Sequence, residues 1–302
     1  MNLKELKKLI LKSTENIDKI TKGLASIRTN TLITASGGSM VVAKFLKSVL
    51  EKKNNIIAET MDARDLEYTN LDLFDNIFIV SYSGSNYGVK SSIHDNKKVY
   101  LLSNRKTKIK NEELLHYDIS CEKSFISIET TIIPCSIILK YYLGELFAII
   151  LDEIFASIDE SLFLDLKGTH LNIFSGVETS CSEEFLTSTL VESGISVPLI
   201  HEKYSYCHGR STINKKHDTS SIYLGYNGSE LDKVIKNVLD LTRENYLIME
   251  SLFSDTIVND FYYCIQSMVL LTNIAKSKNI DLRNIKYDRD AVNILYHFKG
   301  SM

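Results

Sequence analysis

The chain has 302 residues, of which 44% are hydrophobic and 24% are charged, and its formal net charge is -3. This is the composition of an ordinary soluble globular protein, long enough for two modest domains or one large α/β domain. The small negative charge argues against a broad nucleic-acid-binding face, but it is compatible with a local anion pocket.

Targeting and redox signals are few. No apolar run reaches the roughly 18 residues of a membrane span, and the N-terminus lacks the apolar segment of a secretion signal. The cysteines are spread along the chain at Cys121, Cys135, Cys181, Cys207 and Cys264. They form no CxxC pair, so we interpret them as free thiols of a cytoplasmic protein. His201 and His208 flank Cys207 without a second ligand cluster, so no metal site is expected.

The first part of the chain alternates helices with short apolar strands. Apolar spacing predicts a helix over residues 2–22. The elements expected next are strand 31–35, helix 39–51, strands 55–59, 77–81 and 99–103, and a long apolar helix over 129–155. Short strands that are apolar throughout indicate a parallel sheet covered by helices on both faces.

The same order recurs in the second part. The expected elements are strand 171–175, helix 181–193, strands 195–200 and 221–225, helix 230–242, strand 245–249 and a long apolar helix over 256–277. We therefore predict an α/β fold that is duplicated near residue 165. The first unit would span residues 1–165, including the N-terminal helix, and the second would span 166–302.

Two turns rich in serine and glycine follow predicted strands of the first part. They are T34-A-S-G-G-S39, which leads into a helix, and S81-Y-S-G-S-N86. Ligands of open α/β sheets bind beyond the carboxyl ends of the strands. The free N–H groups of a helix start and serine hydroxyls favour an anion there, and Gly37 and Gly84 would let the backbone approach it closely.

Each of these turns alone would be explained more simply as a helix cap or a tight turn, and the anion site is favoured because both occur in one half. Neither turn matches the GxGxxG or GxxxxGK[ST] pattern, so no nucleotide and no other cofactor is expected. A third hydroxyl cluster, E122-K-S-F-I-S-I-E-T-T131, precedes the long helix and alone would be a capping region.

These three segments, in this order, resemble the sugar isomerase (SIS) domain. The SIS pattern has a CGxS-like first turn, an SxSGxT second turn and an E-x-x-V-A-S-T-K-like third segment. The resemblance implies two flavodoxin-like subdomains and a sugar-phosphate site lined by Gly37, Ser39, Ser81, Ser83, Gly84, Asn86 and Ser127. The chain departs from the pattern at Asn86, where SIS domains usually have threonine, and at Ile128-Glu129, which replaces Thr-Lys.

The second half resembles the double-SIS enzymes. These include the isomerase part of glucosamine-6-phosphate synthase, phosphoglucose/phosphomannose isomerases and fructoselysine-6-phosphate deglycases. Such enzymes use a glutamate at the end of a helix and a histidine in an HG pair sixteen residues later. Glu192 and His208 have this spacing here. A shifted pairing of Glu202 with His217, at fifteen residues, is the alternative.

The C-terminal segment K278-N-I-D-L-R-N-I-K286 resembles the ending of the synthase, where an active-site lysine stands, and makes Lys286 its counterpart. The resemblance then implies a phosphosugar aldose–ketose isomerase. Glu192 would be the base, provided that burial raises its pKa, and His208 would open the sugar ring. Lys286 or Arg210 would stabilise the developing negative charge.

Two alternatives stay open at this point. A deglycase would use the same base and acid on a 6-phosphofructosyl or glucosyl amine, and a non-catalytic regulator would only bind the phosphosugar. Glu192 could also be a solvated carboxylate at a helix end. Because double-SIS enzymes often take the histidine from a neighbouring subunit, we expect a homodimer or higher homo-oligomer. The expected partner is a small-molecule sugar phosphate, with no nucleic acid and no membrane.

Overall fold

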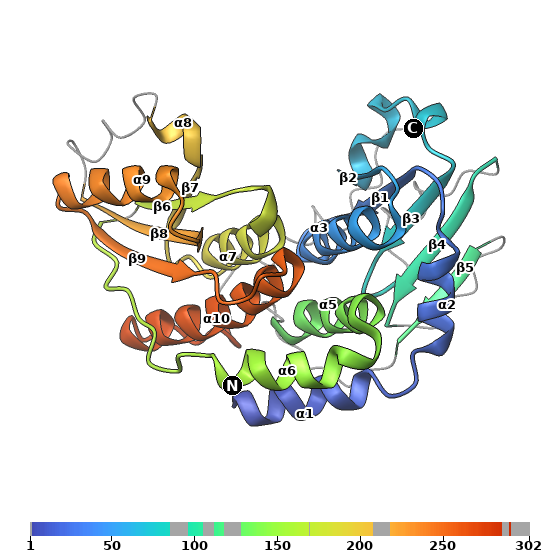
Figure 1. The fold of residues 1–302 in the computed structure, drawn as a ribbon, viewed down its shortest axis with the longest axis horizontal. Helices are drawn as coiled ribbons and strands as arrows, with labels where there is room; N and C mark the ends of the chain where they lie inside the picture. The colour runs from blue at the N-terminus through green and yellow to red at the C-terminus, as the bar shows by residue number, and fades with distance from the viewer. Residues whose placement is uncertain are drawn as a thin grey trace.

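The protein has two α/β halves that lie side by side, as the computed structural model shows (Figure 1). The structure describes residues 2–84, 96–104, 112–117, 128–168, 170–207, 218–285 and 290. Within them, one half holds a five-stranded sheet in the order β2-β1-β3-β4-β5 and the other a four-stranded sheet in the order β7-β6-β8-β9. Every strand pair is parallel, which confirms the predicted fold class.

The first half follows the predicted order closely. Its elements are α1 (Leu3–Ser13), α2 (Asp18–Ser26), β1 (Thr31–Ala35), α3 (Ser39–Val49), the π-helical turn η1 (Leu50–Asn54), β2 (Ala58–Asp62), the 3-10 turns η2 (Ala63–Tyr68) and η3 (Leu71–Leu73), β3 (Asn76–Val80), β4 (Lys98–Ser103), β5 (Glu112–His116), α5 (Ile128–Leu143), the 3-10 turn η4 (Gly144–Leu146) and α6 (Phe147–Ala156).

The second half repeats this order with one strand fewer. Its elements are β6 (His170–Ser175), the 3-10 turn η5 (Val177–Thr179), α7 (Ser180–Glu192), β7 (Val197–Glu202), α8 (Lys203–Cys207), β8 (Thr219–Tyr226), α9 (Glu230–Leu241), β9 (Asn245–Glu250) and α10 (Thr256–Ser277). The division of the chain at residues 165 and 166 stays a prediction; it falls between the end of α6 and the start of β6.

Two predicted elements differ in detail, and two observed elements were not predicted. The N-terminal helix is two helices, because the chain leaves helical geometry at Thr14, whose hydroxyl bonds the Leu11 carbonyl at 2.9 Å. The strand predicted over 55–59 lies three residues later, at β2, because Asn55 adopts a left-handed conformation (φ 54°) that ends the preceding helix. Strand β5 and the short helix α8 were not predicted at all.

The two halves share one hydrophobic core. Helices α3 and α5 of the first half pack against α7 and α10 of the second, and residues of all four belong to one continuous buried cluster. The rings of Phe45 on α3 and Phe261 on α10 have centroids 6.0 Å apart. An ion pair between Lys44 and Glu184, at 2.7 Å, also joins α3 to α7. The packing therefore holds the carboxyl edges of both sheets in a fixed relation.

The long apolar stretch predicted over 129–155 is helical but interrupted at Gly144, where φ is positive. By length and composition alone, the described stretch Glu129–Ala156 would suffice to cross a membrane, yet 56% of its most apolar window is buried within the protein. It packs against α1 and α3, as the central helix of a globular core does.

Candidate functional site

The two serine-rich turns meet at one point of the first sheet. From β1 the chain moves outward to β2 on one side, and β3 pairs with β1 on the other. The carboxyl ends of β1 and β3 therefore flank the point where the strand order reverses, which is where open α/β sheets bind ligands. We call this point the first switch point. The turn of residues 36–39 follows β1 there, and the turn of residues 81–84 follows β3.

The turn after β1 is open. Gly37 has a positive φ of 58°, and of the residues that the structure describes none has an atom within 4 Å of a Cβ built there. A Cβ built at the next turn residue, Gly38, would lie 3.8 Å from the Thr131 hydroxyl, its one contact within 4 Å among the described residues outside its chain neighbours. Helix α3 then begins at Ser39, and no side chain of the described residues caps its first N–H groups. An uncapped helix start beside open space favours a bound anion.

The turn after β3 is held by its own side chains. The Ser81 hydroxyl is buried and accepts the Gly84 N–H at 3.2 Å, and Gly84 has a positive φ of 62°. The Ser103 hydroxyl at the end of β4 donates to the Tyr82 carbonyl at 3.2 Å. This leaves Ser83, which is partly exposed, as the hydroxyl of the turn available to a ligand.

Sequence reasoning missed an ion pair at the edge of the turn after β1. The Ser36 hydroxyl donates to Asp62 at the end of β2, at 3.3 Å, and Arg64 bonds both oxygens of the same carboxylate at 2.8 and 2.9 Å. The Arg64 hydrogen bonds hold the pKa of Asp62 below its usual value. Asp62 is the last residue of β2, and a carboxylate at a strand end is a recognisable signal. Because the strand was predicted over residues 55–59, Asp62 was not expected at its end.

Several predicted site residues lie outside the described residues. They are Asn86, Ser127, His208 and Lys286, together with the alternatives Arg210 and His217. Thr131, the last residue of the third hydroxyl cluster, is described: it lies one turn into α5, with its hydroxyl toward the turn after β1 at Gly38. The structure therefore brings together Gly37, Ser39, Ser81, Ser83 and Gly84 at one edge of the sheet.

Glu192 ends α7 in a partly buried position. It continues a helical stripe that runs through Cys181, Phe185 and Ser188, of which the first two are fully buried. Burial raises the pKa of Glu192, and the negative charge of Glu184 raises it further. Glu192 is thus not a fully solvated helix-end carboxylate, and a raised pKa suits a general base.

Glu202, one residue of the alternative pair, and its neighbour His201 have structural roles in the second half. The His201 ring is buried against Phe174 and Tyr206, and its Nε2 lies 2.9 Å from the Asn172 side-chain oxygen. Glu202 is exposed and accepts the N–H and hydroxyl of Ser205 at 3.1 and 3.0 Å. These contacts explain both residues as parts of the core and of a helix start.

The second sheet has a switch point of its own, between β6 and β8. It is filled by the chain itself. The Glu178 carboxylate folds back over Gly176, where an added Cβ would come within 2.4 Å of it. Lys203 bonds Glu178 and the Gly225 carbonyl, each at 3.2 Å, and lies 3.5 Å from Asp232. A buried lysine thus ties the ends of β6 and β8 together.

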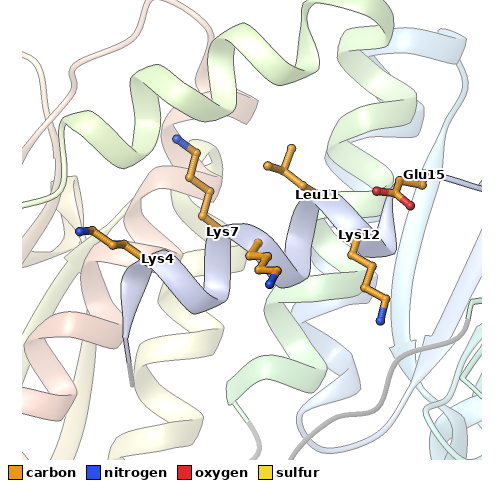
Figure 2. A pocket seen from close by; sticks show the side chains of 6 residues that line it. Lys4, Lys7, Leu11, Lys12 and Glu15 are labelled. Carbon is orange, nitrogen blue, oxygen red and sulfur yellow. The ribbon is translucent and has the colours of Figure 1, made fainter.

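A shallow hollow on the surface lies along α1 (Figure 2). It is lined by Lys4, Lys7, Lys8, Leu11, Lys12 and Glu15. The labelled lysines point in different directions in Figure 2, and Lys7 is paired with Asp152 at 2.9 Å. The hollow contains no residue of a strand end, so we do not assign the function to it.

No protein-family profile matches the chain, and no curated protein matches it. Solved structures do. A tagatose-6-phosphate ketose/aldose isomerase from Escherichia coli superposes with a TM-score of 0.71 at 10% identity, covering 95% of each chain. A glucosamine-6-phosphate deaminase from Thermotoga maritima gives 0.68 at 14% identity, covering 94% of this chain and 96% of that one.

The C-terminal domain of glucosamine-fructose-6-phosphate aminotransferase from Francisella tularensis gives a TM-score of 0.66 at 14% identity, covering 93% of this chain and 95% of that one. These proteins have SIS-type folds, and the likeness extends over nearly the whole of both chains. The two-sheet SIS-type fold expected from the sequence is therefore confirmed.

Proposed function

We propose that the chain is an enzyme that binds a sugar phosphate at the first switch point and interconverts its aldose and ketose forms. The observation that carries the proposal is the uncapped start of α3 over the open turn at Gly37, beside the serine turn that follows β3. An anionic group placed there would receive backbone N–H groups and the hydroxyls of Ser39 and Ser83.

The reaction needs a base beside the sugar. In the open-chain aldose phosphate, Glu192 would take the proton from C2, and the electron pair would form the C1–C2 double bond of an enediolate. The same proton would return to C1, while the hydroxyl proton moves from O2 to O1, which gives the ketose. The burial that raises the pKa of Glu192 supports this role, because a more basic carboxylate takes a carbon-bound proton more readily.

His208 and Lys286 complete the proposed site, His208 for ring opening and Lys286 for stabilising the enediolate oxygen. We propose further that the enzyme is a cytoplasmic homo-oligomer in which His208 can come from a neighbouring subunit. Mixing inactive Glu192→Gln and His208→Ala chains tests this, since hybrids with one intact site would regain activity only if the two residues come from different subunits.

Release of an amine from a 6-phosphofructosyl or glucosyl amine is the second candidate. It is supported by the likeness to a glucosamine-6-phosphate deaminase and to the C-terminal domain of an aminotransferase. Both candidates share the phosphate site, but only the second releases a leaving group, the amine, so the choice of substrates in one experiment separates them.

The test is a panel of sugar phosphates and 6-phosphofructosyl amino acids, each paired with its unphosphorylated form. Thermal shifts report binding to the native state, and turnover is then measured for each binder. We expect shifts only from phosphorylated members, with turnover that Glu192→Gln removes while the shift persists. Shifts of equal size from both forms would contradict the phosphate site. A shift without turnover by the wild-type chain would favour a binding-only regulator.

A further inference from the structure

Helices α5, α7 and α10 meet at a cluster of three fully buried cysteines and one aspartate. The Sγ atoms of Cys181 on α7 and Cys264 on α10 are 3.5 Å apart. Asp260, one turn before Cys264 on α10, has a side-chain oxygen within 4.8 Å of both sulfurs. Cys135 on α5 is buried beside the Cys181 thiol. All four side chains are almost completely shielded from solvent.

The spacing of these atoms fits a tetrahedral metal ion. Two sulfurs that are each about 2.3 Å from one zinc ion stand about 3.8 Å apart, close to the separation of Cys181 and Cys264. Three atoms that lie within 4.8 Å of one another share a point at most about 2.8 Å from each, so shifts of roughly half an ångström give zinc distances. Cys135, which is buried beside the Cys181 thiol, is the nearest candidate for a fourth donor.

The charge around the cluster also favours a cation with thiolate ligands. Asp260 accepts the N–H groups of Cys181 and Ser182 at 3.1 and 2.9 Å, one with each oxygen, and so closes the start of α7. A carboxylate has about four acceptor positions, so lone pairs remain for a metal. Three thiolates and the carboxylate around a divalent ion would carry two net negative charges, which the start of α7 partly offsets.

We propose that Cys181, Cys264 and Asp260, with Cys135 as fourth ligand, bind one structural zinc ion that joins α5, α7 and α10. Thiolate-rich tetrahedral sites select zinc over magnesium and calcium, which prefer oxygen ligands. Binding displaces the thiol protons of the ligating cysteines to solvent, and because the cluster is buried the ion must enter as the chain folds. The zinc would lie on the same helical stripe of α7 that ends at Glu192. The proposal does not depend on the sugar-phosphate function.

The full-length chain is expressed with zinc in the medium, freed of loose metal, and unfolded in denaturant with a chromogenic chelator. About one zinc ion per chain should be released on unfolding and almost none before. Cys181→Ser and Cys264→Ser should each lower the content to less than about a tenth of an ion. The matched control replaces Cys121, which lies outside the described residues, and Cys207, the last residue of α8, by serine and should keep the metal.

Cobalt substitution gives a readout that does not depend on variants that may misfold. The wild-type chain refolded with Co²⁺ should show the thiolate-to-cobalt charge-transfer absorption of a tetrahedral site. A wild-type chain without bound zinc, refolded with equal yield and melting temperature with and without zinc, would overturn the proposal. So would loss of zinc in the Cys121 and Cys207 control, or a mass lower by two hydrogens that reveals a Cys181–Cys264 disulfide.

Discussion

The two switch points of the molecule have the same strand topology, but the first is open among the described residues and the second is filled by side chains of the chain itself. In each sheet the first strand lies between the second and the third, so the crevice opens at the same place. In the first half the turn after the strand is Gly37-Gly38, with open space above Gly37 among the described residues. In the second half the corresponding turn carries Glu178, whose carboxylate covers Gly176 and pairs with Lys203. Duplicated architecture does not imply two ligand sites.

The helix starts differ in the same way. Within the described part of the chain no side chain caps the start of α3, whereas Asp260 reaches from α10 to accept two N–H groups at the start of α7. In the second half, Asp260 accepts the N–H groups at the start of α7, and Glu178 pairs with Lys203. These are the groups that would otherwise attract an anion. Two acidic side chains, Glu178 and Asp260, therefore distinguish the second switch point from the first, which has the same strand topology.

The largest effect is expected when the turn after β1 is given the negative charge that Glu178 places in the turn after β6. Gly38 stands three residues after its strand, as Glu178 does after β6, and its backbone is helical, so a side chain is tolerated. We expect Gly38→Glu to weaken phosphosugar binding by about 100-fold or more, because a carboxylate would compete for the start of α3 and repel the phosphate. Isothermal titration measures the loss.

Gly38→Gln is the matched control, since it adds nearly the same volume without the charge. Affinity should fall much less with glutamine than with glutamate, and both variants should melt close to the wild-type temperature. Equal losses from both would mean that the side chain blocks the site by size alone, and unchanged affinity in Gly38→Glu would remove the first switch point as the phosphate site.

The second prediction tests whether the other switch point is held by its own ion pairs. Lys203 has 11% of its side chain exposed and faces Asp232, which has 1% exposed. We expect Lys203→Met to lower the free energy of unfolding by about 2 kcal/mol, because it leaves a buried carboxylate without its cation. Denaturant titration measures this, and phosphosugar affinity at the first site should not change.

Lys233→Met is the control for Lys203→Met. Lys233 forms a pair of similar length with Glu230, at 2.9 Å, but 56% of the lysine and 91% of the glutamate side chain is exposed. Its loss should cost less than about 0.5 kcal/mol. If Lys203→Met and Lys233→Met lower the free energy of unfolding by the same amount, the buried ion pairs of Lys203 with Glu178 and Asp232 do not stabilise the fold as described.

A smaller effect is expected from single hydroxyls at the two helix starts. Ser39→Ala should lower the affinity for a phosphorylated sugar about tenfold, the usual loss for one hydrogen bond to a charged group. Ser180→Ala, at the start of α7, should leave the affinity unchanged. Binding of the unphosphorylated sugar should not change in either variant. If Ser180→Ala weakens phosphosugar binding as much as Ser39→Ala, the assignment of the phosphate to the first half is wrong.

The open site was visible in the sequence because its parts are local. The strand over 31–35 and the glycine and serine residues that follow it are adjacent in the chain, and the strand has the predicted bounds. The turn after β3 is likewise continuous with its strand. Propensity and turn chemistry act over a few residues, so both turns and their place at strand ends could be predicted.

The closed site was not visible, because its parts come from distant segments. Lys203 is 25 residues from Glu178, and Asp260 is 78 residues from the N–H group of Ser182. Nothing in the spacing of these residues indicates a pair. Edge strand β5 was missed for another reason: its residues Glu112 and Glu113 are charged, and a strand at the edge of a sheet can be polar.

The smallest expected effect comes from the charges of Glu184 and Lys44 near Glu192. Glu184 lies on α7 two turns before it and raises its pKa, and Lys44 of α3 pairs with Glu184 at 2.7 Å and lies 3.9 Å from Glu183. If Glu192 is the base, activity is lost as the pH falls through its pKa, which is above that of an ordinary glutamate. Glu184→Gln removes the negative charge and should move this acidic limb of kcat/KM to lower pH, while the part of the rise that is due to burial remains.

Lys44→Met should move the same limb the opposite way, because Glu184 would keep its negative charge without a neutralising partner. The profiles of kcat/KM against pH for the two variants and the wild type, taken at low salt, measure both shifts. Two coincident profiles would show that the group titrating in the limb is not Glu192. Because Lys44 belongs to the first half and Glu184 to the second, opposite shifts would show that the ion pair between the halves tunes the base that serves the open switch point.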